Sequence, residues 1–158
     1  MKEKIKVIIA DDNKSISDIL KRYLSEYEDI EILGIANTDE EEIDLIERLK
    51  PQIVITDLMR NHKYTGLDII KKYYYQKRGP EFLIISAEVK ERIIPSNMEI
   101  GGYIEKPFYD YSIVVKKLRK IKQNIVMKKE YAKIKNQVTM LKFKSIIGLF
   151  KAKKCESM

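Results

Sequence analysis

The sequence predicts an α/β fold: a doubly wound, five-stranded parallel sheet with a C-terminal helical extension. Short apolar runs alternate with amphipathic helical patterns, and the alternation is repeated five times. The runs are apolar at successive positions, which is typical of strands that helices cover on both faces. Because crossovers between parallel strands are right-handed, the helices are expected on both sides of the sheet.

The expected strands are short, and most are rich in β-branched residues. They occupy residues 7–10, 30–36, 53–56, 82–85 and 103–104. Apolar residues three or four positions apart predict helices over residues 16–27, 39–49, 67–74 and 89–98, and helix again after Pro107. Thr38 or Asp39 can cap the second helix, and Pro51 ends it. We expect a domain over residues 1–124 and a tail over residues 125–158.

Composition limits the kind of protein. Hydrophobic residues make up 44% of the 158 residues, enough for one domain with a core. The single cysteine, Cys155, excludes an internal disulfide or a cysteine-based zinc site. Asp11 and Asp12 interrupt the N-terminal apolar run, so it is not a signal peptide. No apolar stretch approaches the roughly 20 residues of a membrane span, and a cytoplasmic location is expected.

Charge is divided unevenly along the chain. Residues 1–110 contain 17 Lys/Arg and 22 Asp/Glu, a net charge of −5, and residues 111–158 contain 14 and 2, a net charge of +12. Such asymmetry is typical of a segment that meets an anionic partner, and also of a solvated helix face. Both interpretations stay open.

Five polar side chains follow strands of the expected sheet. Asp11 and Asp12 follow the first strand, Asp57 the third, Ser86 the fourth and Lys106 the fifth. Ligands of open α/β sheets bind outside the carboxyl ends of the strands, where these residues would meet. Each also has a plainer interpretation, since Asp is a common helix cap and a lysine before proline can be a loop residue.

This set of residues suits phosphoryl chemistry. Clustered carboxylates repel one another and need a cation, and hard oxygen ligands suit Mg²⁺. One carboxylate can act as the nucleophile and become an acyl phosphate. A lysine and a hydroxyl can bind the phosphoryl oxygens.

The chain resembles the receiver domains of response regulators in two-component and phosphorelay signalling. The matching segments are residues 8–13 (IIADDN), 53–57 (IVITD), 83–87 (LIISA) and 102–108 (GYIEKPF), within a resemblance over residues 4–124. It implies a flavodoxin-like receiver fold and a signalling switch that is not an enzyme.

The resemblance also implies a role for each site residue. Asp57 would accept a phosphoryl group from a phosphohistidine of a sensor histidine kinase or phosphotransfer protein. Ser86 and Lys106 would contact that group, and Tyr103 would be the aromatic residue that changes position. The Mg²⁺ ligands would be Asp11, Asp12, Asp57 and the backbone carbonyl of Met59. The bond before Pro107 is expected to be cis. The downstream protein target is not specified by the sequence.

The loop after Asp57 departs from the family. Receivers usually have a Met-Pro pair three and four residues after the phosphorylated Asp, where this chain has Arg60 and Asn61. The loop is also one residue longer than usual, which leaves open a receiver that is no longer phosphorylated. His62 in this loop could be a ligand or phosphodonor, or a solvated loop residue.

The tail carries a narrow apolar seam flanked by lysines. Its residues recur at alternating four- and three-residue spacing: Met127, Tyr131, Ile134, Val138 and Leu141. The seam could form a homodimer or pack back on the receiver. The basic end, with a second apolar cluster at residues 146–150, could contact anionic lipid or nucleic acid. Helix is expected from about residue 128 to 144.

Two other functions compete with the phosphorylated receiver. The first is a phosphorylation-independent scaffold whose basic tail binds nucleic acid, membrane or protein. The second is a phosphohydrolase with an Asp nucleophile and Mg²⁺. That chemistry usually needs an acid/base Asp two residues after the nucleophile, and Met59 at this position argues against it.

Overall fold

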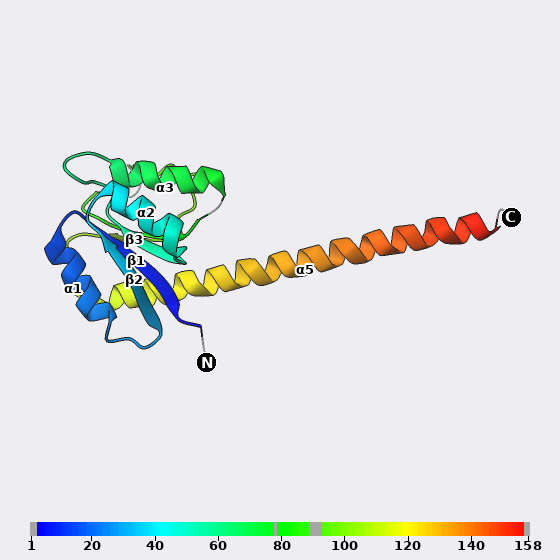
Figure 1. The fold of residues 1–158 in the computed structure, drawn as a ribbon, viewed down its shortest axis with the longest axis horizontal. Coiled ribbons are helices and arrows are strands. Elements are labelled where there is room, and N and C mark those ends of the chain that lie inside the picture. The colour runs from blue at the N-terminus through cyan, green and yellow to red at the C-terminus, as the bar shows by residue number, and fades with distance from the viewer. Residues whose placement is uncertain (1–2, 78, 89–92, 157–158) are drawn as a thin grey trace. The chain divides into compact units, whose positions relative to one another are not determined.

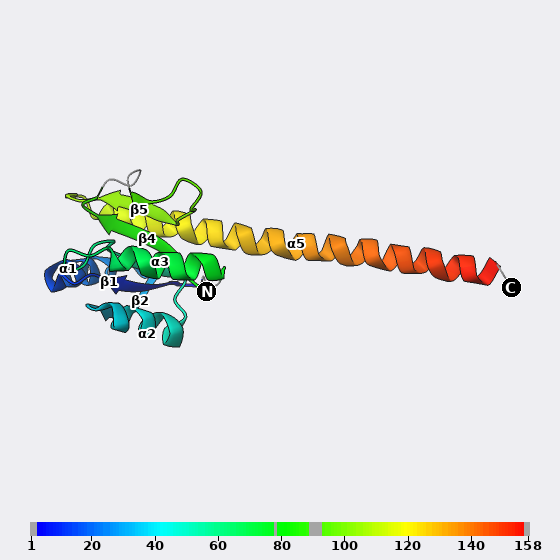
Figure 2. The ribbon, with the colours of Figure 1, turned by 90° about the horizontal axis from the view of Figure 1, so that it is seen from above.

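The computed structural model describes residues 3–77, 79–88 and 93–156, with side chains up to residue 147. Its centre is a five-stranded, all-parallel sheet in the order β2-β1-β3-β4-β5 (Figures 1 and 2). The strands are β1 (Ile5–Ala10), β2 (Ile30–Ala36), β3 (Ile53–Thr56), β4 (Glu81–Ser86) and β5 (Gly102–Glu105). This confirms the predicted doubly wound α/β class.

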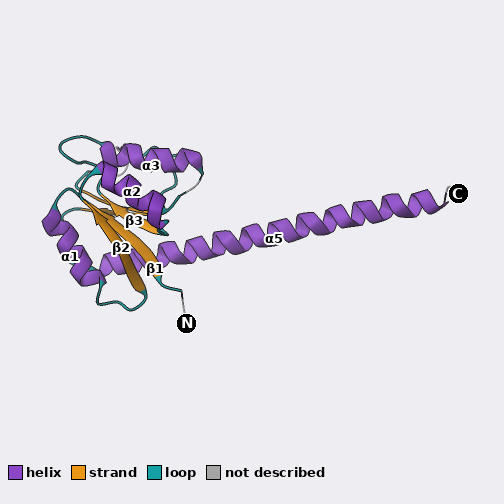
Figure 3. Cartoon of the chain, viewed as in Figure 1, coloured by secondary structure: helices purple, strands orange, loops and turns teal. Residues whose placement is uncertain are grey.

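Helices cover both faces of the sheet. They are α1 (Lys14–Leu24), α2 (Asp39–Leu49), α3 (Thr65–Gln76) and α5 (Ser112–Glu156). Figure 3 shows α2 and α3 on one face, and α1 with the first turns of α5 on the other. The helix expected over residues 89–98 lies partly outside the described residues. The bond between Lys106 and Pro107 is cis, as expected.

Burial on both faces fixes the register of the central strands. Ile8, Val54 and Ile84 pack with Ile46 and Leu67 of the helices in one buried cluster. The intervening strand residues are buried on the opposite side, so β3 is buried at all four positions. A shift of one residue would exchange the two faces. The carboxyl ends of β1 and β3 are therefore held level, with Ala10 beside Thr56.

Side-chain caps set where two helices begin. The Asn13 carboxamide oxygen accepts a hydrogen bond from the Ser15 N–H at 3.1 Å, so Asn13 caps α1 and the two preceding aspartates do not. Thr38 caps α2 through the Glu41 N–H at 3.2 Å. This leaves the Asp11 and Asp12 carboxylates free for other contacts.

The chain divides into two compact units, residues 1–122 and 123–158. The second unit is the continuation of α5, which confirms the predicted C-terminal helical extension. Among the described residues, no helix combines the length and the apolar character needed to cross a bilayer.

Candidate functional site

Lys106 joins two carboxylates at the carboxyl edge of the sheet. Its Nζ donates to Asp57 Oδ2 at 2.7 Å and to Asp11 Oδ2 at 3.1 Å. The two aspartates follow the adjacent strands β1 and β3, and Lys106 follows β5. The structure therefore brings together three of the residues that the sequence singled out.

Burial and charge act against each other at this cluster. Asp11 is only 5% exposed, and burial raises the pKa of its carboxyl, although the Asn13 N–H and Lys106 oppose the shift. Burial alone would lower the pKa of the Lys106 ammonium, but Asp57 and Asp11 outweigh it and raise the pKa. Lys106 therefore stays a cation beside a carboxylate that is costly to leave charged.

The backbone of Asp57 is fixed from two sides. Its N–H donates to the Ala10 carbonyl at 3.2 Å. On the other side, a Cβ added to Gly66 in α3 would lie 2.0 Å from the Asp57 carbonyl oxygen, so only glycine fits there. The Met59 N–H donates to Asp57 Oδ1 at 3.3 Å. The side chain itself is half-buried and reaches the surface.

The extra loop residue is accommodated in a two-residue hairpin. Arg60 and Lys63 exchange backbone hydrogen bonds of 2.8 and 2.9 Å, and Asn61 and His62 between them have φ of 48° and 61°. Positive φ at both central residues is the pattern of a type I′ turn. The Asn61 N–H donates to Asp12 Oδ2 at 3.1 Å, so Asp12 contacts the hairpin. His62 is exposed.

Ser86 and Tyr103 lie on the adjacent strands β4 and β5, two register positions apart. Ser86 is 1% exposed, and its Oγ accepts from the Glu88 N–H at 3.4 Å. The Tyr103 hydroxyl donates to the Glu88 carbonyl at 2.6 Å. Burial raises the pKa of Tyr103, and a hydrogen bond with Ser86 opposes this. The two residues thus share one hydrogen-bonded group with the backbone after β4.

A buried ion-pair network behind the site was not predicted. Arg60 is 4% exposed and donates to Asp39 Oδ1 at 2.6 Å, to Glu42 Oε2 at 2.5 Å and to Thr56 Oγ1 at 2.6 Å. Burial raises the pKa of the Glu42 carboxyl, and the Arg60 guanidinium opposes this shift. The available signal was the spacing of Asp39 and Glu42, which places both acids on one helix face.

The charges and donor atoms of the cluster fit a small divalent cation. Asp11, Asp12, Asp57 and Lys106 sum to a formal charge of −2. The donors are carboxylate oxygens, which Mg²⁺ prefers. In the part of the chain that the structure describes, no three metal-ligating side chains are grouped closely enough to hold a metal ion, and Asp12 Oδ2 instead accepts from the Asn61 N–H. The site thus has the charge and the ligand type that Mg²⁺ needs. The third carboxylate, that of Asp12, is the neighbour of Asp11 in the sequence.

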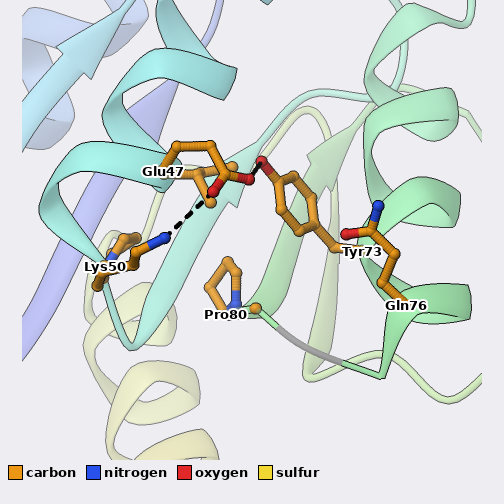
Figure 4. A pocket seen from close by; sticks show the side chains of 8 residues that line it. Glu47, Lys50, Tyr73, Gln76 and Pro80 are labelled. Atoms are coloured by element: carbon orange, nitrogen blue, oxygen red, sulfur yellow. Dashed lines mark hydrogen bonds and ion pairs between the residues drawn. The ribbon is translucent and has the colours of Figure 1, made fainter.

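A cavity on the receiver unit lies away from the carboxylate cluster. It measures about 480 Å³ and borders α2 and α3 near Pro51 and Pro80, the residues that precede β3 and β4 (Figure 4). Glu47 accepts from Tyr73 Oη at 2.8 Å and from Lys50 Nζ at 3.1 Å. Because it lies at the amino ends of the strands, this cavity is separate from the carboxylate cluster.

Known proteins match the chain within its first unit, residues 1–122. The response regulator receiver domain family matches residues 7–119. The receiver domain of the Francisella response regulator 1452 is similar in structure, with 23% identity, a TM-score of 0.63, and coverage of 77% of this chain and 99% of that one. The receiver domain of a putative LuxO repressor protein from Vibrio parahaemolyticus is also similar, with 22% identity and a TM-score of 0.62. The match covers 78% of this chain and 97% of that one.

A third similar structure is RcsB from Salmonella enterica serovar Typhimurium, bound to the promoter rprA in the presence of the phosphomimetic BeF3−. It gives 21% identity, a TM-score of 0.61, and coverage of 75% of this chain and 99% of that one. The family match covers well over half of the sequence, and the fold agrees with it. The chain belongs to the response regulator receiver family, whose members are signalling modules.

Proposed function

We propose that this receiver is a phosphorylation-driven switch in which Asp57 accepts a phosphoryl group from a phosphohistidine. The donor would be a sensor histidine kinase or a phosphotransfer protein. The observation that carries the proposal is the position of Lys106 Nζ between Asp57 Oδ2 and Asp11 Oδ2, at 2.7 and 3.1 Å. It places a fixed positive charge beside a carboxylate whose side chain is 13% exposed.

The transfer needs few groups. An Asp57 carboxylate oxygen forms a bond to phosphorus while the P–N bond of the phosphohistidine breaks, and the imidazole nitrogen keeps the electron pair and takes up a proton. Lys106 neutralises negative charge on the phosphoryl oxygens, and the Ser86 hydroxyl donates to one of them. The Asp57 backbone is held in place by the hydrogen bond from its N–H to the Ala10 carbonyl and by the close approach of Gly66.

Mg²⁺ would be held by the carboxylates of Asp11, Asp12 and Asp57, with the Met59 backbone carbonyl as a further ligand. When bound, it neutralises the phosphoryl charge and orients the displacement. Asp12 is one residue from Asp11 and would exchange its Asn61 contact for the cation. The burial of Asp11 supports this assignment, because a nearby cation favours its charged form.

The signal would leave through Ser86 and Tyr103. Ser86 Oγ now accepts a hydrogen bond from the Glu88 N–H at 3.4 Å. A phosphoryl group on Asp57 would draw the Ser86 hydroxyl away from that N–H. The Tyr103 ring shares that group of hydrogen bonds through the Glu88 carbonyl. A change in the populations of two Tyr103 positions would then alter the surface that a downstream protein binds.

Intact-mass measurement after incubation with acetyl phosphate and Mg²⁺ tests this function. We expect an added phosphoryl group on the wild type, none on Asp57→Asn, and normal labelling of the control Asp18→Asn, which changes an exposed aspartate of α1 in the same way. Chelation of Mg²⁺ should suppress labelling. No adduct on the wild type would favour a scaffold that works without phosphorylation, and turnover of added phosphoesters would favour a phosphohydrolase.

A further inference from the structure

The part of α5 beyond residue 122 exposes an apolar stripe, here called the tail seam. Its five members are well exposed: Met127 59%, Tyr131 70%, Ile134 59%, Val138 44% and Leu141 66%. Their four- and three-residue spacing aligns them along one side of the helix. Apolar side chains in such a stripe gain free energy when another surface removes them from water.

The spacing assigns each member to a coiled-coil position. Tyr131 and Val138 fall at position a, and Met127, Ile134 and Leu141 fall at position d. In a pair of helices each of these side chains enters a space between four residues of the facing helix. A β-branched residue at a with leucine at d, as in Val138 and Leu141, favours two strands.

The flanking charges distinguish the two possible directions. The e positions are all lysine, and the g positions are two glutamines and one glutamate: Lys128, Lys135 and Lys142 at e, and Gln123, Glu130 and Gln137 at g. In a parallel pair each g residue meets the e residue five positions later in the other helix, so Glu130 meets Lys135 and no like charges meet. In an antiparallel pair e meets e, and lysines face lysines.

We infer that the tail seam pairs with the tail seam of a second copy of this chain as a parallel, two-stranded coiled coil. A second copy is a better occupant than the receiver unit, because it presents a matching apolar seam and the pairing of Glu130 with Lys135, whereas residues 1–122, with 22 Lys/Arg and 22 Asp/Glu, offer no net negative charge. The pairing does not depend on phosphorylation of Asp57. Because the seam is short, the dimer should dissociate on dilution.

Sedimentation of the full chain over a wide concentration range tests the pairing. We expect the mass to rise from one chain to two. Val138→Asp places a charge within the seam and should raise the dissociation constant at least about tenfold, which corresponds to about 1.4 kcal/mol. The control Asn136→Asp introduces the same side chain on the opposite face of the helix, where the residue is exposed, and should leave the constant unchanged.

Disulfide trapping tests the direction. In a Cys155→Ser background, Met127→Cys and Leu141→Cys each place one cysteine near an end of the seam. Each should cross-link to its own copy in a parallel pair. In an antiparallel pair with the two seams aligned, identical ends would lie about 21 Å apart along the axis, at about 1.5 Å per residue, and would not cross-link. Asn136→Cys, on the outer face, is the control and should not cross-link efficiently.

Three results would overturn the inference. The first is a chain that stays monomeric at every concentration or associates only when nucleic acid or anionic vesicles are added. The second is a dimer that neither Met127→Cys nor Leu141→Cys can trap. The third is equal loss of pairing in Val138→Asp and Asn136→Asp, which would assign the effect to net charge and not to the seam.

Discussion

At the scale of single residues, Arg60 is the least expected feature of the site. Its side chain is 3% exposed and bridges α2 to the end of β3 through Glu42, which is 0% exposed. Replacing one member of a buried ion pair leaves the other charge without a partner, whereas replacing both with apolar residues is often tolerated. The pair therefore makes the stability of this region depend on two residues together.

Arg60→Met should lower the free energy of unfolding by roughly 3–5 kcal/mol because it leaves the buried Glu42 charge without its partner. The double variant Arg60→Met/Glu42→Leu should recover much of this loss in urea unfolding. Arg48→Met is the matched control: its pair with Asp44 is 61% and 64% exposed, so the loss should stay within about 1 kcal/mol. Additive effects of the two buried substitutions would contradict the coupling.

Tyr23 gives a pH-dependent test of the contact between α1 and the loop that follows it. A hydrogen bond with the Tyr27 hydroxyl at 3.0 Å is the main cause that raises the pKa of Tyr23 from 10.0 to about 12. The folded chain therefore keeps a proton that the unfolded chain releases. Stability should fall as the pH rises through this interval, since the unfolded state binds fewer protons there.

The urea midpoint of the wild type should consequently drop more steeply between pH 10 and pH 12 than that of Tyr23→Phe. Tyr109→Phe, at a residue that is 90% exposed, is the control and should follow the wild type. Parallel pH profiles for all three proteins would show that the hydrogen bond between the two tyrosines is not formed in solution.

At the scale of elements, the contact between α3 and the loop after β3 determines where Asp57 lies. Gly66 is buried in the first turn of α3 against the Asp57 carbonyl. Alanine is the better helix former by about 1 kcal/mol, but overpacking of this kind typically costs about 1–3 kcal/mol. Because the atom in the way is backbone, the clash should outweigh the propensity.

Gly66→Ala is therefore expected to destabilise the chain and to slow phosphorylation by acetyl phosphate, measured by mass against time. Gly34→Ala is the control, since a Cβ there meets only the Leu45 side chain, at 3.1 Å, which can move. An unchanged phosphorylation rate in Gly66→Ala would mean that the position of Asp57 does not depend on this contact.

The sequence predicted the elements that local patterns determine. The strands, and the positions of Asp11, Asp57 and Lys106 at their carboxyl ends, follow from apolar runs that end at polar residues. The ion pair of Arg60 with Glu42 could not be predicted in this way, because its partners are 18 residues apart and Glu42 stands in a run of acids that resembles a solvated helix face. Burial of a charge depends on tertiary packing, which local periodicity does not report.

The loop after Asp57 shows the same limit. Its additional residue was visible in the sequence, but the hairpin that accommodates it was not, since neither Asn61 nor His62 is glycine and both have positive φ. Asparagine tolerates this conformation, which is a weak indication at best. The hydrogen bond from the Asn61 N–H to Asp12 depends on the hairpin, so it could not be predicted from the sequence either.

At the scale of the whole molecule, charge separates the two units. Residues 1–122 are balanced, so the net charge of +7 comes from residues 123–158, which contain nine lysines and two glutamates. A receiver unit with no net charge is thus joined to a basic helix with its own apolar seam. We expect phosphorylation at Asp57 and pairing through the tail to be separable: Asp57→Asn should remove only the first, and Val138→Asp only the second.

Borohydride trapping can identify the residue that carries the phosphoryl group, which we propose to be Asp57. Reduction of the acyl phosphate converts the modified aspartate to homoserine, which peptide mass spectrometry can place in the sequence. After incubation with acetyl phosphate and Mg²⁺, we expect homoserine at position 57 and unchanged aspartate at Asp11 and Asp12. Homoserine at another aspartate, or at none, would contradict it.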